Sequence, residues 1–322
     1  MIKAFLRCRL ALVIVAFSYG LPCALAGGTW VPDMGEVDLE ERPRDEAEAR
    51  FKHAVALLAS GESKSAARQL RGLLEEHPEA PWANRARYML AVAQYNLERY
   101  EAAFNTLNSY QKDESEDKAI QQVENLQYKA AEARTEQNLN KGIELLDQLA
   151  ERSGDPELAA QAQKSKADAL REDGQYLKAS DEYLALIDTF PRSELVAECW
   201  YRIGMCHLEL ARWIGRGTEH LKEAQTRLKD FLYNFPDTQF APEAREALQD
   251  AQRLHAEKYA RIARYYIGPA DRPAAALPYL RHVRRTVPDK QLGQWAEKQI
   301  RKIHRDRESP PRGHLKPIKL SQ

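Results

Sequence analysis

Glycine and β-branched residues are sparse in this sequence, whereas Ala, Leu, Glu, Arg and Gln dominate it. Strands are enriched in β-branched and aromatic residues, and the residue types that are common here favour helices. No segment shows the alternating pattern of a convincing strand. The composition therefore predicts helix almost everywhere, in a chain of 322 residues that is long enough for one large domain or two ordinary ones.

Signatures of catalysis, metal binding and nucleic-acid binding are missing. No Gly-rich phosphate loop follows a strand, and no Gly-x-Ser-x-Gly elbow occurs. Cys206 and His207 are adjacent and so point in different directions on a helix, and no two histidines are spaced as in zinc helices. The formal net charge is zero, which disfavours a basic nucleic-acid-binding domain. We predict a protein without enzymatic activity, cofactor or metal.

Long apolar runs are also lacking, except for a short one near the N-terminus. Lys3, Arg7 and Arg9 precede an apolar run from Leu10 to Tyr19, and Ala24 to Ala26 supplies a small-x-small pattern before Gly27. The run is shorter than the roughly 20 residues that a membrane span needs. This arrangement predicts a signal peptide over residues 1–26 with cleavage after Ala26, rather than a retained anchor.

Cysteine is rare, and only Cys199 and Cys206 would remain in the exported chain. Seven residues of helix would separate them by about 10 Å, which is too far for a disulfide. We expect both to be small buried apolar residues.

The sequence does contain an internal repeat. Residues 160–196 combine a helix with Ala167 and Leu170, a turn at residues 173–175, and a second helix that ends at Phe190-Pro191. An aromatic residue after the turn, small residues between paired helices and a closing proline are typical of tetratricopeptide (TPR) repeats. Four further copies begin near the following residues: Ala47, Asn84, Val123 and Ala197.

The fifth copy differs from the others. An eight-residue insertion over residues 214–221 separates its two helices, and insertions in such repeats fall in loops. A long helical stretch then runs from Pro242 to Tyr266, followed by a break at Gly268-Pro269 and a last helix that carries Leu280 and Val283. We predict an all-α fold, a right-handed α-solenoid of about five to six TPR-like helix pairs.

Domain boundaries follow from the same pattern. Residues 27–45 are expected to form a flexible N-terminal segment, residues 46–306 the solenoid, and residues 307–322 a disordered basic tail. The last 22 residues carry seven basic and two acidic side chains. They could bind anionic lipid or the acidic surface of a partner, or could simply keep the end of the chain soluble.

Two motifs are more specific than the repeat. Leu232 to Thr238 reads LYNFPDT, and Ala256 to Tyr266 reads AEKYARIARYY. With the run from Tyr201 to Met205, they resemble the BamD family of outer-membrane protein assembly factors, most closely over residues 197–290. The resemblance implies a periplasmic scaffold, associated with the outer membrane, that binds a β-barrel assembly subunit and unfolded outer-membrane proteins. The alternative is a periplasmic adaptor that coordinates cell-wall or division proteins through the same repeats.

One feature departs from that family, whose members are usually lipoproteins. A lipid-attachment cysteine follows a small residue, with an aliphatic residue two positions further back. Cys23 instead follows Pro22, and Gly20 occupies the aliphatic position. This departure argues against lipid at Cys23. The simpler expectation is a soluble periplasmic protein, and the alternative is that a partner tethers it to the membrane.

Groove-facing positions of a TPR array lie one, four, eight and eleven residues after each repeat start. In this sequence they define a tentative peptide-binding groove of basic, amide and tyrosine side chains, formed by Arg85, Tyr88, Tyr95, Gln127, Arg134, Lys164, Arg171 and Tyr201. Guanidinium groups can bind a peptide carboxylate at two points, and tyrosine rings add apolar contact area. The alternative is that these are ordinary packing or solvated residues, as any charged helical protein would have.

Overall fold

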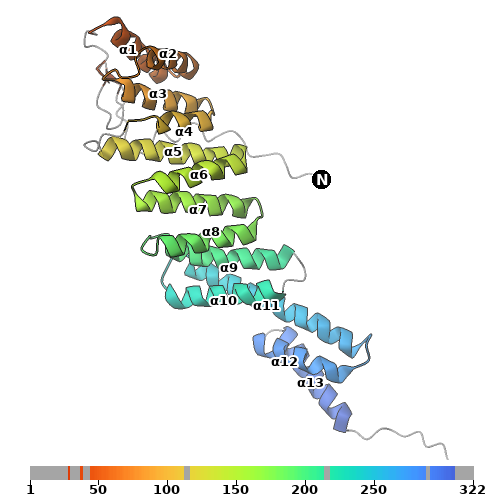
Figure 1. The fold of residues 1–322 in the computed structure, drawn as a ribbon. Coiled ribbons are helices and arrows are strands. Elements are labelled where there is room, and N and C mark those ends of the chain that lie inside the picture. The colour runs from red at the N-terminus through yellow and green to blue at the C-terminus, as the bar shows by residue number, and fades with distance from the viewer. Residues whose placement is uncertain are drawn as a thin grey trace, which may run out of the picture. The chain divides into compact units, whose positions relative to one another are not determined.

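The computed structural model describes residues 28–29, 37–38, 44–111, 117–213, 218–287 and 291–308. The predicted signal peptide, Cys23 and the predicted tail beyond Glu308 lie outside these residues. The chain divides into two compact units, Met1–Leu145 and Leu146–Gln322, and each is described by itself. Figure 1 shows the helices in chain order.

The first unit contains two antiparallel helix pairs and the beginning of a third. Its helices are α1 (Glu46–Ala59), α2 (Ser63–Glu76), α3 (Ala83–Asn96), α4 (Tyr100–Asn108) and α5 (Asp117–Gln137). Each helix from α1 to α4 packs on the next one along the chain. Helix α6 (Leu139–Arg152) carries the boundary between the two units.

Two short strands precede α1 within the segment that was expected to be flexible. They are β1 (Gly28–Thr29) and β2 (Val37–Asp38), which pair in antiparallel fashion. These two pairs of residues are an addition to the predicted all-α fold class and do not change it. A strand of two residues is too short to leave an alternating pattern in the sequence.

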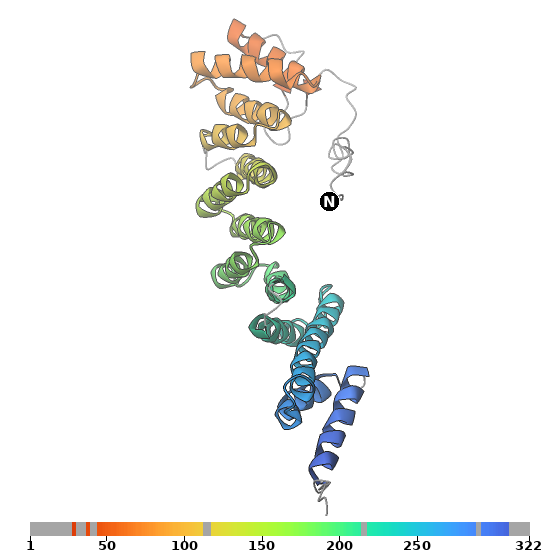
Figure 2. The ribbon, with the colours of Figure 1, turned by 90° about the vertical axis from the view of Figure 1, so that its right-hand side faces the viewer.

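The second unit continues the helix pairs. Its helices are α7 (Pro156–Glu172), α8 (Tyr176–Thr189), α9 (Val196–Trp213), α10 (Thr218–Asn234), α11 (Ala241–Ile267), the 3-10 turn η1 (Pro273–Ala276), α12 (Leu277–Thr286) and α13 (Gln291–Glu308). Figure 2, which looks nearly along the helices, shows α7 and α9 in one row and α8 and α10 in the other. This alternation confirms an α-solenoid of TPR-like pairs.

Local sequence signals set the helix ends. Asp45 caps α1 by accepting a hydrogen bond from the Glu48 amide at 2.8 Å, and Asp155 caps α7 in the same way, with Pro156 as the first helical residue. Gly61 and Gly174 close the turns within their pairs, with φ of 86° and 82°. Glycine adopts these left-handed angles without steric cost.

Small residues let the helices approach each other, as the repeat predicted. The first helix of each pair buries one of them fully; these are Ala54, Ala91, Ala130, Ala167 and Gly204. A Cβ atom added to Gly204 would lie 2.8 Å from the Leu228 side chain on α10. Glycine at this position therefore allows α9 and α10 to pack closely.

Two details of the C-terminal part differ from the sequence-based expectation. Thr218 to Leu221, which were expected in a loop insertion, form the first turn of α10, so these extra residues lengthen a helix. Residues 214–217 lie outside the described part of the chain. The expected last helix is followed by a separate one, α13, which packs on α12 and α11 through Ala296, Ile300 and Ile303.

Candidate functional site

Helix α3 carries three of the predicted groove residues. Arg85 is exposed, and Tyr88 and Tyr95 are half-buried. The Tyr95 ring tilts against Tyr100 at a centroid distance of 5.2 Å. Burial raises the pKa of Tyr88 above its ordinary value, so its hydroxyl stays protonated and can donate a hydrogen bond. Helix α3 thus carries one exposed predicted groove residue, Arg85, and two half-buried ones, Tyr88 and Tyr95.

The two predicted residues on α5 hold that helix against α4. Gln127 is buried, and its amide nitrogen donates to Asn108 Oδ1 at 2.8 Å. Arg134 pairs with Glu101 at 3.3 Å and also donates to Gln137. Both side chains already have protein partners within their own unit, so a peptide would have to compete with them.

In the second unit, Lys164 lies between two carboxylates. Its ammonium nitrogen is 2.8 Å from Asp168 and 3.3 Å from Glu198, which belongs to the next helix pair. Burial lowers the pKa of Lys164, but hydrogen bonds and charges from Asp168 and Glu198 outweigh it, and the pKa is raised. Glu198 is in turn paired with Arg202 at 3.0 Å. The positive charge of Lys164 is therefore balanced by charges within the unit.

Asp168 joins this network to α8. The hydroxyl of the fully buried Tyr183 donates to Asp168 Oδ1 at 2.5 Å, and the Arg171 Nε lies 3.6 Å from the same oxygen, whereas Lys164 pairs with Oδ2. Burial acts to raise the pKa of Asp168, but hydrogen bonds from Lys164 and Tyr183 hold it below the ordinary value. Predicted groove residues Lys164 and Arg171 thus share one carboxylate that also anchors the paired helix.

Tyr201 is buried, with 5% of its surface exposed. Its ring stacks on Phe240 at 5.5 Å and tilts against Phe231 at 5.8 Å. Its hydroxyl donates to Glu243 on α11 at 3.3 Å. The ring therefore contributes mainly to the core between α9, α10 and α11, and offers little surface to a ligand.

Both expected free cysteines, Cys199 and Cys206, are buried on α9. Burial raises the pKa of each thiol to about 12, so both stay protonated and unreactive near neutral pH. This confirms their prediction as small apolar core residues.

Histidine pairs were not found from the sequence, because their members lie on different helices. His207 and His220 stack at 5.7 Å, with their Nδ1 atoms 3.4 Å apart. His255 and His282 lie 4.7 Å apart, ring to ring, and both pack against Tyr259. Among the described residues, no three His, Cys, Asp or Glu side chains come together in a way that could hold a metal ion.

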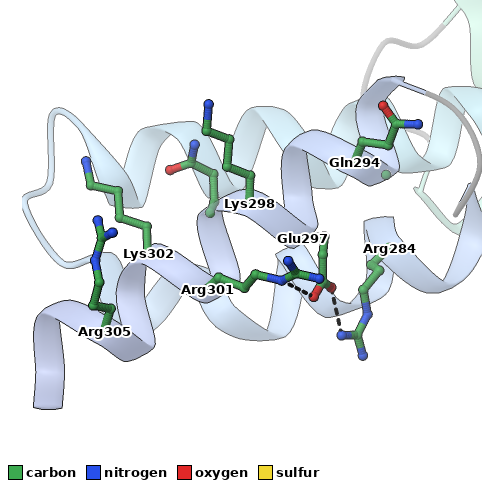
Figure 3. A pocket seen from close by; sticks show the side chains of 9 residues that line it. Arg284, Gln294, Glu297, Lys298, Arg301, Lys302 and Arg305 are labelled. Atoms are coloured by element: carbon green, nitrogen blue, oxygen red, sulfur yellow. Dashed lines mark hydrogen bonds and ion pairs between the residues drawn. The ribbon is translucent and has the colours of Figure 1, made fainter.

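Several surface hollows among the described residues of the second unit involve charged side chains. One, of about 430 Å³, lies at the turn between α7 and α8 and includes Glu172, Asp173, Glu209 and Arg212. Another, of about 500 Å³, lies along α13 and is lined mainly by basic residues (Figure 3). In the part of the chain that the structure describes, no helix has the length and apolarity needed to cross a membrane.

Comparisons with known proteins identify a family and several solved structures that are similar to this chain. The family YfiO, described as outer membrane lipoprotein, matches residues 43–124 and 119–305. No curated protein matches the chain. Among solved structures, the TPR protein YrrB, described as having an unusual peptide-binding site, is 15% identical, with 71% of this chain and 97% of that chain covered and a TM-score of 0.32.

Two other solved structures are similar at the same level. A TPR protein from Parabacteroides merdae is 13% identical over 79% of this chain and 98% of its own, with a TM-score of 0.34. The apo form of RapI is 14% identical over 80% of this chain and 100% of its own, with a TM-score of 0.34. The fold assignment rests on the helix pairs and not on these distant similarities. Through the family match, which covers most of its length, the chain belongs to the YfiO family of outer membrane lipoproteins and is a BamD-like TPR protein.

Proposed function

We propose that this protein is a non-enzymatic periplasmic scaffold that acts like the BamD subunit in the assembly of outer-membrane β-barrel proteins. It binds a β-barrel assembly subunit and segments of unfolded outer-membrane proteins. The observation that supports this proposal is the family match over residues 43–124 and 119–305, which includes residues of both units. TPR pairs support protein–protein interaction because each pair presents helix faces to partners.

The first unit has the more accessible set of candidate peptide-binding residues. The exposed Arg85 can bind a carboxylate of a client peptide through two nitrogen atoms. Tyr88 and Tyr95, on the same helix, supply apolar rings that end in a hydroxyl. We infer that a peptide end or an acidic side chain binds along α3, while Lys164 and Arg171 mainly maintain the second unit.

Identification of the partner tests the proposed role most directly. The tagged full chain would be purified with its partners from cross-linked outer membranes, and the partners would be identified by mass spectrometry. A β-barrel subunit of the assembly type as the main partner is the expected result. If cell-wall or division enzymes are recovered instead, the protein is the periplasmic adaptor and the proposal is wrong.

The peptide site is tested by reversing one charge. Arg85→Glu should weaken binding of a carboxylate-terminated client peptide by about fivefold, because an exposed ion pair contributes about 1 kcal/mol. Arg68→Glu, which changes an exposed arginine on α2, is the matched control and should bind as the parent does. Equal affinity of parent and Arg85→Glu protein in fluorescence anisotropy would exclude this site. Reversal of Lys164 is unsuitable, because it would place a third carboxylate beside Asp168 and Glu198.

A further inference from the structure

A strongly basic hollow lies on the outer side of α13 in the second unit. Its volume is about 500 Å³, and α12 contributes one residue to it. We call this surface the α13 basic face; it is lined by Arg284, Gly293, Gln294, Glu297, Lys298, Gln299, Arg301, Lys302 and Arg305. Five of these side chains are cationic and one is acidic, and Arg305 also pairs with Asp306, outside the lining, at 3.8 Å.

The single carboxylate neutralises only one side of the face. Glu297 accepts from Arg284 at 2.9 Å and from Arg301 at 3.0 Å (Figure 3). Lys298 and Lys302, one helical turn apart, are exposed and form no ion pair with any residue that the structure describes. In Figure 3 both lysines point away from Glu297. Two cations on the same side of α13 are thus available to an external anion.

Helix stability does not explain this concentration of charge. Cations near a helix C-terminus interact favourably with the helix dipole, but the effect is limited to the last turn. Arg305 lies in that range of α13, and Arg284 lies in the last turn of α12, whereas Lys298 lies more than two turns before Glu308. Like charges one turn apart, such as Lys298 and Lys302, instead destabilise a helix slightly. The helix dipole therefore does not explain the charges of Lys298 and Lys302.

We propose that the α13 basic face binds the anionic headgroups of a membrane surface. Protein interfaces depend on aromatic and Arg anchors that are buried in well-packed pockets. The α13 basic face has arginines, but none of its nine lining residues is aliphatic or aromatic, so it offers no apolar pocket around them. The apolar residues of α13, including Ile300 and Ile303, are buried against α11 and α12 and cannot insert into a bilayer. A purely electrostatic contact needs no aromatic anchor and no apolar insertion, because basic side chains alone attract an anionic leaflet.

The sequence that follows extends the same charge. Residues 309–322 contain Arg312, Lys316 and Lys319 and no acidic residue. A positive charge that continues along the chain beyond one hollow suits a broad anionic surface better than a single acidic peptide. Each basic residue close to such a surface raises the membrane partition coefficient about fivefold.

Vesicle binding by the full chain tests this inference. Flotation assays would compare vesicles of phosphatidylglycerol and phosphatidylcholine in equal amounts with vesicles of phosphatidylcholine alone. We expect binding to the anionic vesicles only, and we expect it to disappear in 1 M salt, where charges are screened within about 3 Å. Binding to both kinds of vesicle would show an apolar attachment and would overturn the proposal.

Charge reversal locates the site. Lys298→Glu/Lys302→Glu should lower the partition coefficient at least about tenfold. Lys64→Glu/Arg68→Glu is the matched control, because it reverses two exposed cations with the same spacing on α2 and should bind normally. Thermal unfolding followed by circular dichroism establishes whether both double variants fold. If Lys298→Glu/Lys302→Glu does not fold, Lys298→Gln/Lys302→Gln is used in its place. Equal binding by parent and variant, or binding to a polyglutamate peptide but not to vesicles, would overturn the proposal.

Partner purification does not enter this assay, so its outcome is independent of the proposed scaffold role.

Discussion

Two ion pairs, one from each unit, lie in different environments. In the first unit, Arg50 and Glu76 form an ion pair at 2.6 Å whose side chains are 42% and 51% exposed. In the second unit, Lys164 and Glu198 pair with 19% and 17% of their side chains exposed. The first pair thus lies in solvent, and the second lies between helix pairs. Charges between repeats stabilise the stack only as a complete set, since each would be costly to bury alone.

This difference changes how basic residues on the first helices of the pairs are interpreted. Arg85 in the first unit faces solvent, whereas Lys164, at a different groove position of its repeat in the second unit, is balanced by Asp168 and Glu198. A basic residue at a groove position is therefore not sufficient evidence for a peptide site. The charges of neighbouring helices decide whether it is accessible.

The largest contrast between the units is expected from removal of Asp168. Asp168→Ala should lower the free energy of unfolding by about 2 to 3 kcal/mol, because it leaves Tyr183 and Lys164 without a shared acceptor in a partly buried position. Hydrogen exchange and urea unfolding would measure the loss, which should concentrate in α7, α8 and α9. Glu76→Ala, the control in the first unit, should change nothing measurable, since its ion pair is exposed. Equal stability of the Asp168→Ala and parent proteins would contradict a structural role for the network.

A second contrast arises from a buried histidine cluster in the second unit. His255 is 3% exposed, and its Nδ1 lies 3.1 Å from Gln225 Nε2. The pKa of His255 is lowered to about 4, mainly by burial and also by the charges of His282, Lys222 and Lys258, while Glu219 opposes them. The pKa of His282 is also lowered, mainly by burial.

Acidification should therefore weaken the second unit. Between the ordinary histidine pKa of about 6.5 and the folded value near 4, the unfolded chain binds a proton that folded His255 does not, so stability falls as pH falls. The loss is at most about 1.4 kcal/mol per pH unit for one group, or about 2 kcal/mol between pH 6.5 and 5. Urea unfolding across this range would measure it. His255→Gln should flatten the curve, and an unchanged slope in that variant would assign the pH dependence to other groups.

Much of the fold could be predicted because its signals are local. Small residues at repeat positions, closing prolines and the 3.6-residue spacing predicted every pair from α1 to α10. The insertion at residues 214–221 was misplaced because helix propensity alone cannot tell a loop from an extra turn of helix. Helix α13 was not predicted as a separate helix: residues 46–306 were assigned to the solenoid, but no helix was identified after the one that carries Leu280 and Val283.

The candidate site was less predictable, because it depends on contacts between repeats. Repeat positions suggested Tyr201 as a groove residue, but its burial depends on Phe240 and Glu243, about 40 residues away in the chain. Likewise, Glu198 reaches Lys164 from the next pair. Periodicity describes one pair at a time and contains no information about such contacts.

Two glycines within helices, one in each unit, should give smaller changes in stability that have opposite signs when each is replaced by alanine. Gly204→Ala in the second unit should lower the free energy of unfolding by about 1 to 2 kcal/mol, because the new Cβ would lie 2.8 Å from Leu228. Gly72→Ala in the first unit should raise it by about 0.5 to 1 kcal/mol, because nothing lies within 4 Å and alanine favours helix. Thermal unfolding followed by circular dichroism would measure both. If both variants change stability in the same direction, close packing does not explain Gly204.

The smallest effect concerns a turn in the first unit that has glutamate at the position where two other repeats have glycine. Glu98 follows Ala91 by seven residues, as Gly61 follows Ala54 and Gly174 follows Ala167, and it has a left-handed φ of 59°. A side chain in this conformation costs about 1 to 2 kcal/mol, of which the greater flexibility of unfolded glycine offsets about half. Glu98→Gly should therefore stabilise the first unit by about 0.5 kcal/mol, and the Glu98 carbonyl would still accept from Gln137. Gly174→Glu should destabilise the second unit by a similar amount. Hydrogen exchange within each unit would measure both changes, and a loss of stability in Glu98→Gly would show that its side chain has a role beyond the turn.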